Sequence, residues 1–248
     1  MKSLMFLHNR HTPDDQDIWK EAFRRGWNTA RVNQIDVKDK MEGFDFVRYY
    51  GNTLHGAQIE NQLPFKFVPI DYSILAKISD YYTSRHIHYM RFADLKQPVQ
   101  EDLFIKPARD KFFEAKVYLR GSMIEGAPQG DDMVYVSDVV RFMDEVRCFV
   151  LDGEIQTASL YRIDGISYRE VDMPPEEINF DDQLKDTIIP KWTKEICSKF
   201  KLPRGVVIDF GRFHDGGWAV IEFNEAWASG LYYCRPDKCF DVIVASQT

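Results

Sequence analysis

The chain has 248 residues, of which 44% are hydrophobic, 29% charged and 14% aromatic, values that indicate a folded protein of one or two domains and exclude a disordered chain. Its formal net charge of −7 argues against a protein that binds nucleic acid through the phosphate backbone, because such proteins carry a surplus of basic residues. The sequence has no run near the ~20 apolar residues of a membrane-spanning helix, and its four cysteines have neither C-x-x-C nor zinc spacing, so we expect a cytoplasmic protein with reduced thiols.

The first part of the chain alternates between predicted strands and helices. The apolar spacing predicts, in order, a strand at 3–8, a helix at 14–26, strands at 30–35 and 44–51, a helix at 57–63, a strand at 65–70 and, after an Asp71 N-cap, a helix at 72–84. Such alternation is typical of an α/β domain with a small, mostly parallel sheet. We place this domain at residues 1–98.

The pattern changes to successive strands after residue 102. Apolar runs separated by short turns predict strands at 103–108, 115–123, 133–142, 145–155 and 156–162. Asp152-Gly153 lies between two alternating runs and predicts a tight hairpin turn. The fold class we expect is therefore α/β followed by α+β, with the second part at residues 99–248.

The last part of the chain contains a second predicted hairpin. A polar segment at 164–180 predicts a loop, and residues 181–201 have the apolar spacing of a helix that Pro190 should kink or split. The elements expected after it are strands at 205–213 and 218–227, joined at Asp215-Gly216-Gly217, and a terminal helix at 239–246.

Three oxygen-bearing side chains are expected to meet on this hairpin. Asp209 lies near the end of the first strand, while Glu222 and Asn224 are two residues apart on its partner and share one face. Two carboxylates and an amide oxygen are donors that a hard cation such as Mg²⁺ prefers. The alternative is a solvated sheet face with ordinary polar residues.

Lysines in the middle of the chain indicate a site for an anion. Lys106 lies inside an apolar strand, where an ammonium group needs an anionic partner. That partner is a nucleotide phosphate or, alternatively, a carboxylate in a structural ion pair. Lys111 and Lys116 follow, and they either close over the γ-phosphate or remain solvated surface lysines.

A break in an apolar strand at Ser137-Asp138 indicates a hinge. Its backbone groups and apolar neighbours suit the edge and faces of an adenine ring, and a plain strand end is the alternative. Arg147 follows, two residues after Glu145 on the same strand face. An arginine aimed into a cleft suits bidentate binding of phosphate or carboxylate, and a pair with Glu145 is the alternative.

The order of these motifs resembles the ATP-grasp superfamily over residues 102–235. The sequence has I-K-P in a strand, a hinge strand, E-x-R before a strand–Asp-Gly–strand hairpin, V-x-I-D-F, and I-E-F-N-E-A followed by A-W-A-S-G. The resemblance implies a pre-ATP-grasp domain at 1–98 and a two-lobed ATP-grasp fold at 99–248. The central lobe is expected at about 99–140 and the C-terminal lobe at about 141–248.

The resemblance also implies a role for each candidate residue. The Mg²⁺ ligands would be Asp209, Glu222 and Asn224. The ATP contacts would be Lys106 and Lys111 at the phosphates, Ser137, Asp138 and Val139 at the adenine, and Arg147 at the γ-phosphate or the acyl phosphate. The substrate contacts would be Arg48, Asn52, Ser229 and Tyr232. The chain departs from the family in D-K-F-F-E-A-K, which lacks the glycines of the usual phosphate loop, so Lys111 would take over that work.

The activity that the resemblance implies is ligation. An ATP- and Mg²⁺-dependent ligase activates the carboxylate of a small molecule or peptide as an acyl phosphate, which an amine or thiol acceptor then attacks. A kinase or phosphotransferase on the same scaffold and a non-catalytic nucleotide-binding module are the alternatives. A homodimer is compatible with the resemblance, because relatives are often dimers, and neither a nucleic-acid nor a membrane partner is expected.

Overall fold

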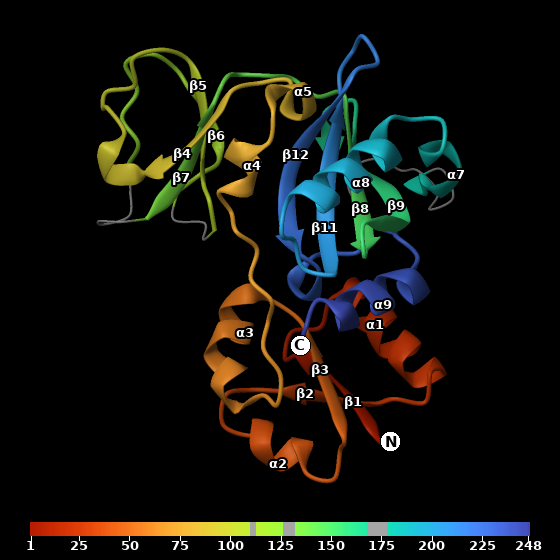
Figure 1. Cartoon of the computed structure of the whole chain (residues 1–248). Helices are drawn as coiled ribbons and strands as arrows, with labels where there is room; N and C mark the ends of the chain where they lie inside the picture. Colours follow the sequence, from red (N-terminus) through yellow and green to blue (C-terminus); the bar gives the residue numbers. More distant parts are fainter. Residues whose placement is uncertain (110–112, 126–131, 168–177) are drawn as a thin grey trace.

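The computed structural model describes residues 1–109, 113–125, 132–167 and 178–248, which form a three-stranded N-terminal sheet, a four-stranded central sheet and a five-stranded C-terminal sheet. Figure 1 shows the unit of the N-terminal sheet at the bottom and the other two sheets side by side above it. Within the described ranges, no helix is both long and apolar enough to cross a bilayer.

The N-terminal sheet has the parallel pairing that the sequence predicts. Its middle strand is β1 (Ser3–His8), which pairs in parallel with β2 (Asn28–Val32) and β3 (Phe46–Tyr50). The helices and turns of this unit are α1 (Pro13–Arg24), α2 (Val37–Met41), α3 (Thr53–Ile59) and η1 (Glu60–Gln62).

Helix α1 has a sequence signal at each end, a capping box at its start and a glycine after its last turn. At its start, the Thr12 hydroxyl accepts from the N–H of Asp15, and the Asp15 carboxylate accepts from the N–H of Thr12, which is a capping box. The helix ends ahead of Gly26, whose φ of +73° favours glycine over residues with a Cβ.

Two elements predicted after this unit are wrong. Residues 65–70 form no strand, since only Phe67 pairs, in an isolated bridge to Gln247. The helix expected at 72–84 is two single turns, α4 (Ile74–Lys77) and α5 (Asp80–Thr83), and Asp71 accepts from the N–H of Ser73 instead of capping a long helix. The apolar side chains of this segment are buried against the C-terminal sheet, so tertiary packing outweighs the local helical pattern.

The central sheet is antiparallel, with the strand order β4-β7-β5-β6. Its elements are β4 (Ile87–Arg91), η2 (Phe92–Asp94), β5 (Leu103–Pro107), β6 (Lys116–Tyr118) and β7 (Met133–Ser137). The strands expected at 115–123 and 133–142 are both shorter than predicted. Because β4 precedes residue 98 yet pairs with β7, we propose drawing the domain boundary ahead of β4 when domains are assigned by sheet.

The C-terminal sheet is antiparallel, with the order β10-β9-β8-β11-β12. Its strands are β8 (Asp144–Leu151), β9 (Glu154–Ile163), β10 (Ile166–Ser167), β11 (Gly205–Arg212) and β12 (Trp218–Glu225). Both predicted hairpins are confirmed. Asp152 and Gly153 have φ of +50° and +82° in the first turn, and Gly216 has φ of +87° in the second.

Helices complete this part of the molecule. They are α7 (Asp181–Leu184), α8 (Ile189–Lys199), η4 (Ala226–Ala228) and α9 (Pro236–Ala245). The split predicted at Pro190 is confirmed, because this proline lies in the first turn of α8 and α7 ends before it. Most of the loop expected at 164–180 lies outside the described residues.

Alternate residues of β8 and β11 point to opposite faces of the C-terminal sheet. Cys148 and Ile208 belong to the core under α8, whereas Phe149 and Val207 belong to the core shared with α9 and the N-terminal sheet. Helix α9 therefore lies between the C-terminal sheet and the N-terminal unit (Figure 1). The central sheet has a core of its own, which includes Ile105.

Candidate active site

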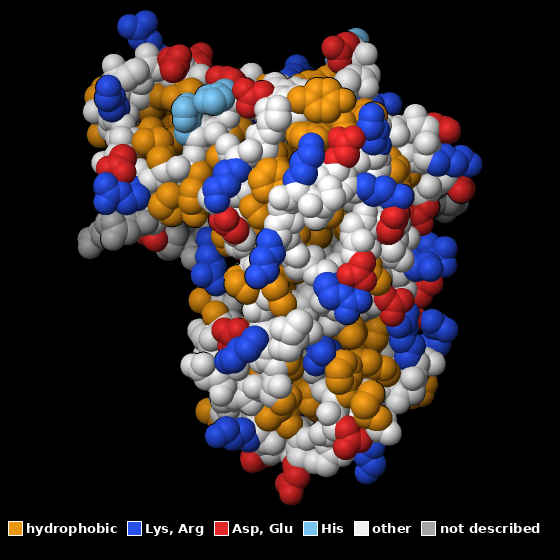
Figure 2. Space-filling model, in the orientation of Figure 1, with side chains coloured by type: hydrophobic (Ala, Val, Ile, Leu, Met, Phe, Trp, Pro, Cys, Tyr) orange, Lys and Arg blue, Asp and Glu red, His pale blue; other side chains and the backbone are white. Residues whose placement is uncertain are grey.

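A cleft with a volume of about 1420 Å³ separates the central sheet from the C-terminal sheet. Its walls include Lys106 from the central sheet, Glu222 and Asn224 from the C-terminal sheet, and Thr53 from the N-terminal unit. Figure 2 shows the unit of the central sheet projecting sideways from the body of the molecule, with basic and acidic side chains interspersed over the visible face. All three parts of the chain therefore contribute to one concave site.

The three residues predicted to bind a metal are brought together by the pairing of β11 with β12. Asp209 lies opposite Glu222 in the ladder, and Val207 lies opposite Asn224. The Asn224 amide donates from Nδ2 to Asp209 Oδ2 at 3.1 Å and to Glu222 Oε1 at 3.0 Å. Two carboxylates and one amide thus converge on a single point of the sheet face.

Asp209 lies beneath this surface, where Arg147 of the neighbouring strand β8 binds it. Arg147 donates from Nε to Asp209 Oδ1 at 2.9 Å, from Nη2 to Asp209 Oδ2 at 2.7 Å, and from Nη1 to the carbonyl of Gly230 at 3.1 Å. The alternative pair of Arg147 with Glu145 is wrong, because Glu145 pairs with Arg162 at 3.3 Å.

The electrostatics of this pair follow from its burial. The Asp209 side chain is 0% exposed, and burial raises the pKa of its carboxyl to about 6, although the Arg147 guanidinium lowers it in part. Arg147 stays charged, since its own pKa is raised by the Asp209 carboxylate against the effect of burial. Its guanidinium also lies 4.6 Å from the centre of the Tyr232 ring, a favourable cation–π arrangement.

The second predicted cation crosses the cleft. The Lys106 ammonium of β5 contacts Glu222 Oε2 of β12 in a charged hydrogen bond. Burial alone would raise the pKa of Glu222, but Lys106 lowers it to about 2. The alternative considered for Lys106, an ion pair with a carboxylate, is therefore present. This pair joins the predicted phosphate-binding residue to a predicted metal ligand.

The hinge residues are only partly oriented as the predicted adenine site needs. Ser137 is buried at the end of β7 and lines the cleft, as does Asp138, whose Oδ2 accepts from the N–H of His86 at 2.9 Å. Val139 is 46% exposed, and its neighbour Val140 lines the cleft in its place.

The four predicted substrate residues fall into two groups. Ser229 and Tyr232 line the cleft. Arg48 does not lie among the described lining residues, because its guanidinium donates to the carbonyls of Val47 and Val244 and lies 4.0 Å from the Phe46 ring centre.

Asn52 and the loop lysines also differ from the prediction. Asn52 accepts from the N–H of His55 at 2.8 Å as the N-cap of α3, which explains its position at the strand end without a ligand. Lys111 lies outside the described residues. Lys116 is a surface lysine that pairs with Glu114 at 2.6 Å.

Among the cleft-lining residues that sequence reasoning missed are Tyr72, Arg85 and Glu225. Tyr72 donates its hydroxyl to the Glu225 carboxylate. Arg85 donates to the carbonyls of Val220 at 3.1 Å and Ile221 at 3.3 Å, and burial lowers its pKa to about 10. The only sequence signal was that Glu225 directly follows Asn224, since the other two reach the cleft from segments distant in the chain.

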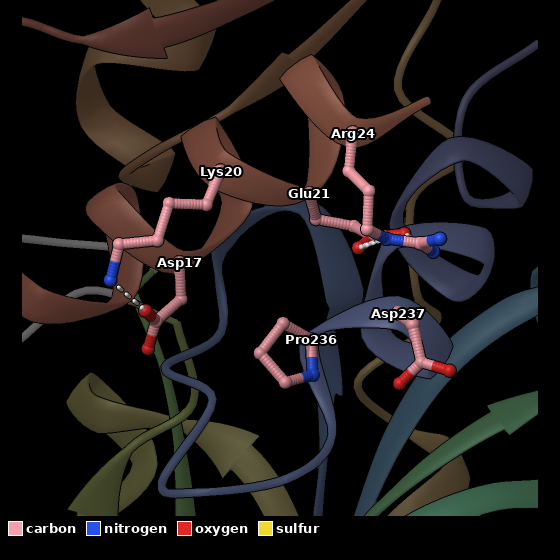
Figure 3. A pocket seen from close by; sticks show the side chains of 6 residues that line it. All are labelled: Asp17, Lys20, Glu21, Arg24, Pro236 and Asp237. Carbon is pink, nitrogen blue, oxygen red and sulfur yellow. Dashed lines mark hydrogen bonds and ion pairs between the residues drawn. The ribbon is translucent and has the colours of Figure 1, made fainter. Parts of the chain in front are cut away.

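A second, shallower pocket of about 440 Å³ lies between α1 and α9 (Figure 3). Its charged side chains all have ion-pair partners: Lys20 pairs with Asp17 at 3.1 Å, Arg24 with Glu21 at 2.7 Å, and Asp237 with Arg235 at 3.0 Å. The pocket is therefore a surface network of ion pairs, and the chemistry is concentrated in the large cleft.

Comparison with known families agrees with this location. A family model described as an ATP-grasp domain of the R2K clade, family 2, matches residues 82–242. Of the described residues that line the cleft, only Thr53 and Tyr72 lie outside that range. A search of curated protein sequences found no match.

Several solved structures share the fold over nearly the whole chain. D-cycloserine synthetase DcsG has a TM-score of 0.60 at 12% identity, covering 97% of this chain and 98% of its own. D-alanine–D-alanine ligase from Bacillus anthracis, solved with ATP, has a TM-score of 0.57 at 14% identity, with 99% and 97% covered. The macrocyclase MdnC from Microcystis aeruginosa MRC, bound with its precursor peptide MdnA, has a TM-score of 0.52 at 11% identity, with 98% and 99% covered.

Proposed function

Because the chain belongs to the ATP-grasp superfamily, we propose that it is an ATP- and Mg²⁺-dependent ligase that joins a carboxylate to an amine or thiol acceptor. The observation that carries the proposal is the contact of Lys106 with Glu222 across the cleft. It joins a cation suited to phosphate oxygens to a cluster of oxygen donors suited to a hard metal ion. A nucleoside triphosphate with its bound metal ion needs both the cation and the oxygen donors within one cleft.

The donors fit Mg²⁺ by their chemistry and their convergence. The Asn224 amide nitrogen contacts both carboxylates, and a rotation of this amide by about 180° would turn its oxygen toward them, which only a cation between the three groups would stabilise. Glu222 and Asn224 would bind the ion from the cleft wall and Asp209 from below. Mg²⁺ held there would supply charge neutralisation for the phosphate oxygens.

We assign the nucleotide to the cleft wall between β5 and the hinge. Lys106 would bind the α- and β-phosphates once it exchanges Glu222 for them, and the backbone at Ser137 and Asp138 would meet the adenine edge. Arg147 would add positive potential where the γ-phosphate is transferred, while its bond to Gly230 orients the turn that follows β12. Lys111 remains our candidate for closure over the γ-phosphate.

The reaction we propose has two steps. A carboxylate oxygen of the donor attacks the γ-phosphorus and ADP leaves, which gives an acyl phosphate; the acceptor then attacks the acyl carbon and phosphate leaves. The chain's own residues position charges and exclude water, and no protein nucleophile is needed. The similar structures are a D-alanine–D-alanine ligase, a D-cycloserine synthetase and a macrocyclase bound with its precursor peptide, so we propose an amino-acid or peptide carboxylate as the donor.

The proposal is tested by trapping the intermediate. The protein is incubated with ATP, Mg²⁺, hydroxylamine and a panel of amino acids of both hands and short peptides. A ligase gives hydroxamate and ADP with at least one acid, because hydroxylamine intercepts an acyl phosphate. A kinase would give a stable phosphate ester and no hydroxamate, and a non-catalytic module would bind ATP without producing ADP; either result would reject the proposal.

A further inference from the structure

We propose that Glu225 binds the ammonium group of the acceptor, which makes the second substrate an amine and not a thiol. This inference rests on the proposed ligase function and narrows it. The observations behind it are the position of Glu225 in the cleft, the neutral partner of its carboxylate and the ion pairs of the other glutamates that line the cleft.

Glu225 lies where the three parts of the chain meet. It is the last residue of β12, directly after Asn224, and its side chain lines the cleft. Its backbone carbonyl accepts from the Ser229 hydroxyl at 2.7 Å. The turn that begins at Glu225 is bound to the N-terminal unit, since the carbonyl of Trp227 accepts from the N–H of Gly51 at 3.0 Å. A group bound by Glu225 would therefore lie in the same cleft as the proposed acyl phosphate.

The carboxylate of Glu225 is bound by a neutral group. Its partner is the hydroxyl of Tyr72, which reaches the cleft from the segment between the N-terminal unit and the central sheet. Burial raises the pKa of Tyr72 well above that of an ordinary phenol, and the Glu225 charge adds to this effect, so the hydroxyl keeps its proton and donates it. In turn, the carbonyl of Tyr72 accepts from the Tyr135 hydroxyl, which fixes the segment against β7.

The other glutamates that line the cleft have basic partners, whereas the carboxylate of Asp138 accepts from the N–H of His86. Glu222 is paired with Lys106, Glu145 with Arg162, and Glu114 with Lys116. No Lys, Arg or His among the described residues lies within ion-pair distance of Glu225, whose carboxylate accepts from the Tyr72 hydroxyl, and Arg109 lines the same cleft without forming an ion pair with it. A half-buried carboxylate without a cation attracts one from solution, and apart from the Mg²⁺ that Glu222 and Asn224 would bind, the cation that the reaction can supply is a protonated amine.

The chemistry of the second step is consistent with this role. The bound ammonium loses one proton to water, and the nitrogen lone pair then forms the C–N bond at the acyl carbon. The C–O bond to phosphate breaks, its electron pair goes to the leaving phosphate, and the phosphate takes up the second nitrogen proton. A thiol acceptor is neutral or anionic at neutral pH, so it would gain nothing from Glu225 and would be repelled as a thiolate.

The test compares charged and uncharged acceptors in matched variants. Product formation is measured near neutral pH with three nucleophiles: glycinamide and ethylamine, which are protonated amines, and hydroxylamine, which is uncharged. The variants are Glu225→Gln, which keeps an acceptor for Tyr72, Glu225→Asp, which keeps the charge, and Glu154→Gln, which removes a charge from the distant β8–β9 hairpin. Thermal unfolding of each variant verifies that it folds.

The expected result is a higher KM for the charged acceptors and an unchanged reaction with the uncharged one. Glu225→Gln should raise the KM for both amines at least about tenfold while hydroxamate formation stays within about twofold of wild type, since only the charged acceptors lose a charge-assisted hydrogen bond. Glu225→Asp should recover part of the loss, and Glu154→Gln should resemble wild type. The inference is overturned if Glu225→Gln lowers hydroxamate and amide formation equally, or if wild type prefers 2-mercaptoethanol to the amines. A wild type that gives no hydroxamate with any acid would instead reject the ligase function itself.

Discussion

Arg147 and Asp209 form a buried, two-point ion pair, with Nε to Oδ1 at 2.9 Å and Nη2 to Oδ2 at 2.7 Å, and this pair lies directly beneath Asn224 and the predicted metal site. Each member excludes water from the other, so neither can be removed alone without leaving an unpaired charge in the sheet.

Removing one partner should destabilise the fold. We expect Asp209→Ala to lower the free energy of unfolding by about 3–5 kcal/mol, because Arg147 would remain as a buried, unpaired cation. The Arg147→Met, Asp209→Leu double variant should lose less than the sum of the single changes. Urea unfolding measures both, and Arg204→Ala, which breaks the exposed pair with Asp152, should change little. An additive double variant would contradict the coupling.

Glu222 carries the metal chemistry in our proposal. Glu222→Gln should reduce Mg²⁺-dependent ADP formation by at least a hundredfold, because it removes a charged ligand that the amide cannot replace, while the side-chain volume stays the same. A coupled ADP assay at saturating Mg²⁺ measures the change. Turnover within a few-fold of wild type would refute the ligand role of Glu222.

Lys106 should act on nucleotide affinity. Lys106→Ala is expected to weaken binding of a non-hydrolysable ATP analogue with Mg²⁺ by about 10- to 100-fold, the loss of one charge-assisted hydrogen bond to phosphate. Calorimetric titration gives the affinity. Lys116→Ala, at a surface lysine ten residues along the same segment, should bind like wild type. Equal losses in the two variants would show that general charge, and not position, explains the effect.

The contact of α9 with β11 depends on a glycine. A Cβ at Gly205 would lie 2.0 Å from the carbonyl oxygen of Val242, so Gly205→Ala should push α9 away from the sheet and lower the free energy of unfolding by about 1–3 kcal/mol or more. The control is Gly217→Ala in the β11–β12 turn, where the nearest atom, Asp215 Oδ1, is 3.2 Å away and belongs to an exposed side chain. Equal denaturation midpoints for the two variants would contradict the packing argument.

Glu21 should make stability depend on acid pH. Its buried carboxylate accepts from Arg24 Nε at 2.8 Å, and this bond, opposed by burial and aided by Arg25, lowers the pKa of Glu21 below its ordinary 4.5 (Figure 3). A lowered pKa in the folded state means that the stabilisation is complete above pH 4.5 and is lost as the pH falls through the folded value. The difference in unfolding free energy between wild type and Glu21→Gln should therefore be largest near pH 7 and shrink below pH 4.5; a difference independent of pH would contradict it.

How much of this was predictable depends on the range of the interactions. The meeting of Asp209 with Glu222 could be predicted because the Asp215-Gly216-Gly217 turn fixes the register of a local hairpin. The Arg147–Asp209 pair could not, because it requires β8 to pair with β11 across the segment that holds α7 and α8.

The same distinction explains the errors. Residues 72–84 have a helical pattern, yet Ile74, Leu75 and Ile78 are buried by packing on a sheet that forms from residues far along the chain. Asn52 follows the end of β3 as predicted, but Arg48 lies in the middle of that strand, and hydrogen bonds with backbone groups already account for both side chains. Sequence pattern identified the residue types of the cleft, whereas the partners of each side chain depended on tertiary contacts.

The central claim, that phosphates and metal bind between Lys106 and the Glu222–Asn224 wall, is tested most directly by a crystal structure of the protein with Mg²⁺ and a non-hydrolysable ATP analogue. We predict the β-phosphate within hydrogen-bond distance of Lys106 Nζ and a metal ion bound by Glu222 and Asn224 Oδ1, with the Lys106–Glu222 pair separated. A nucleotide bound elsewhere, or an intact Lys106–Glu222 pair with no metal beside it, would contradict the account.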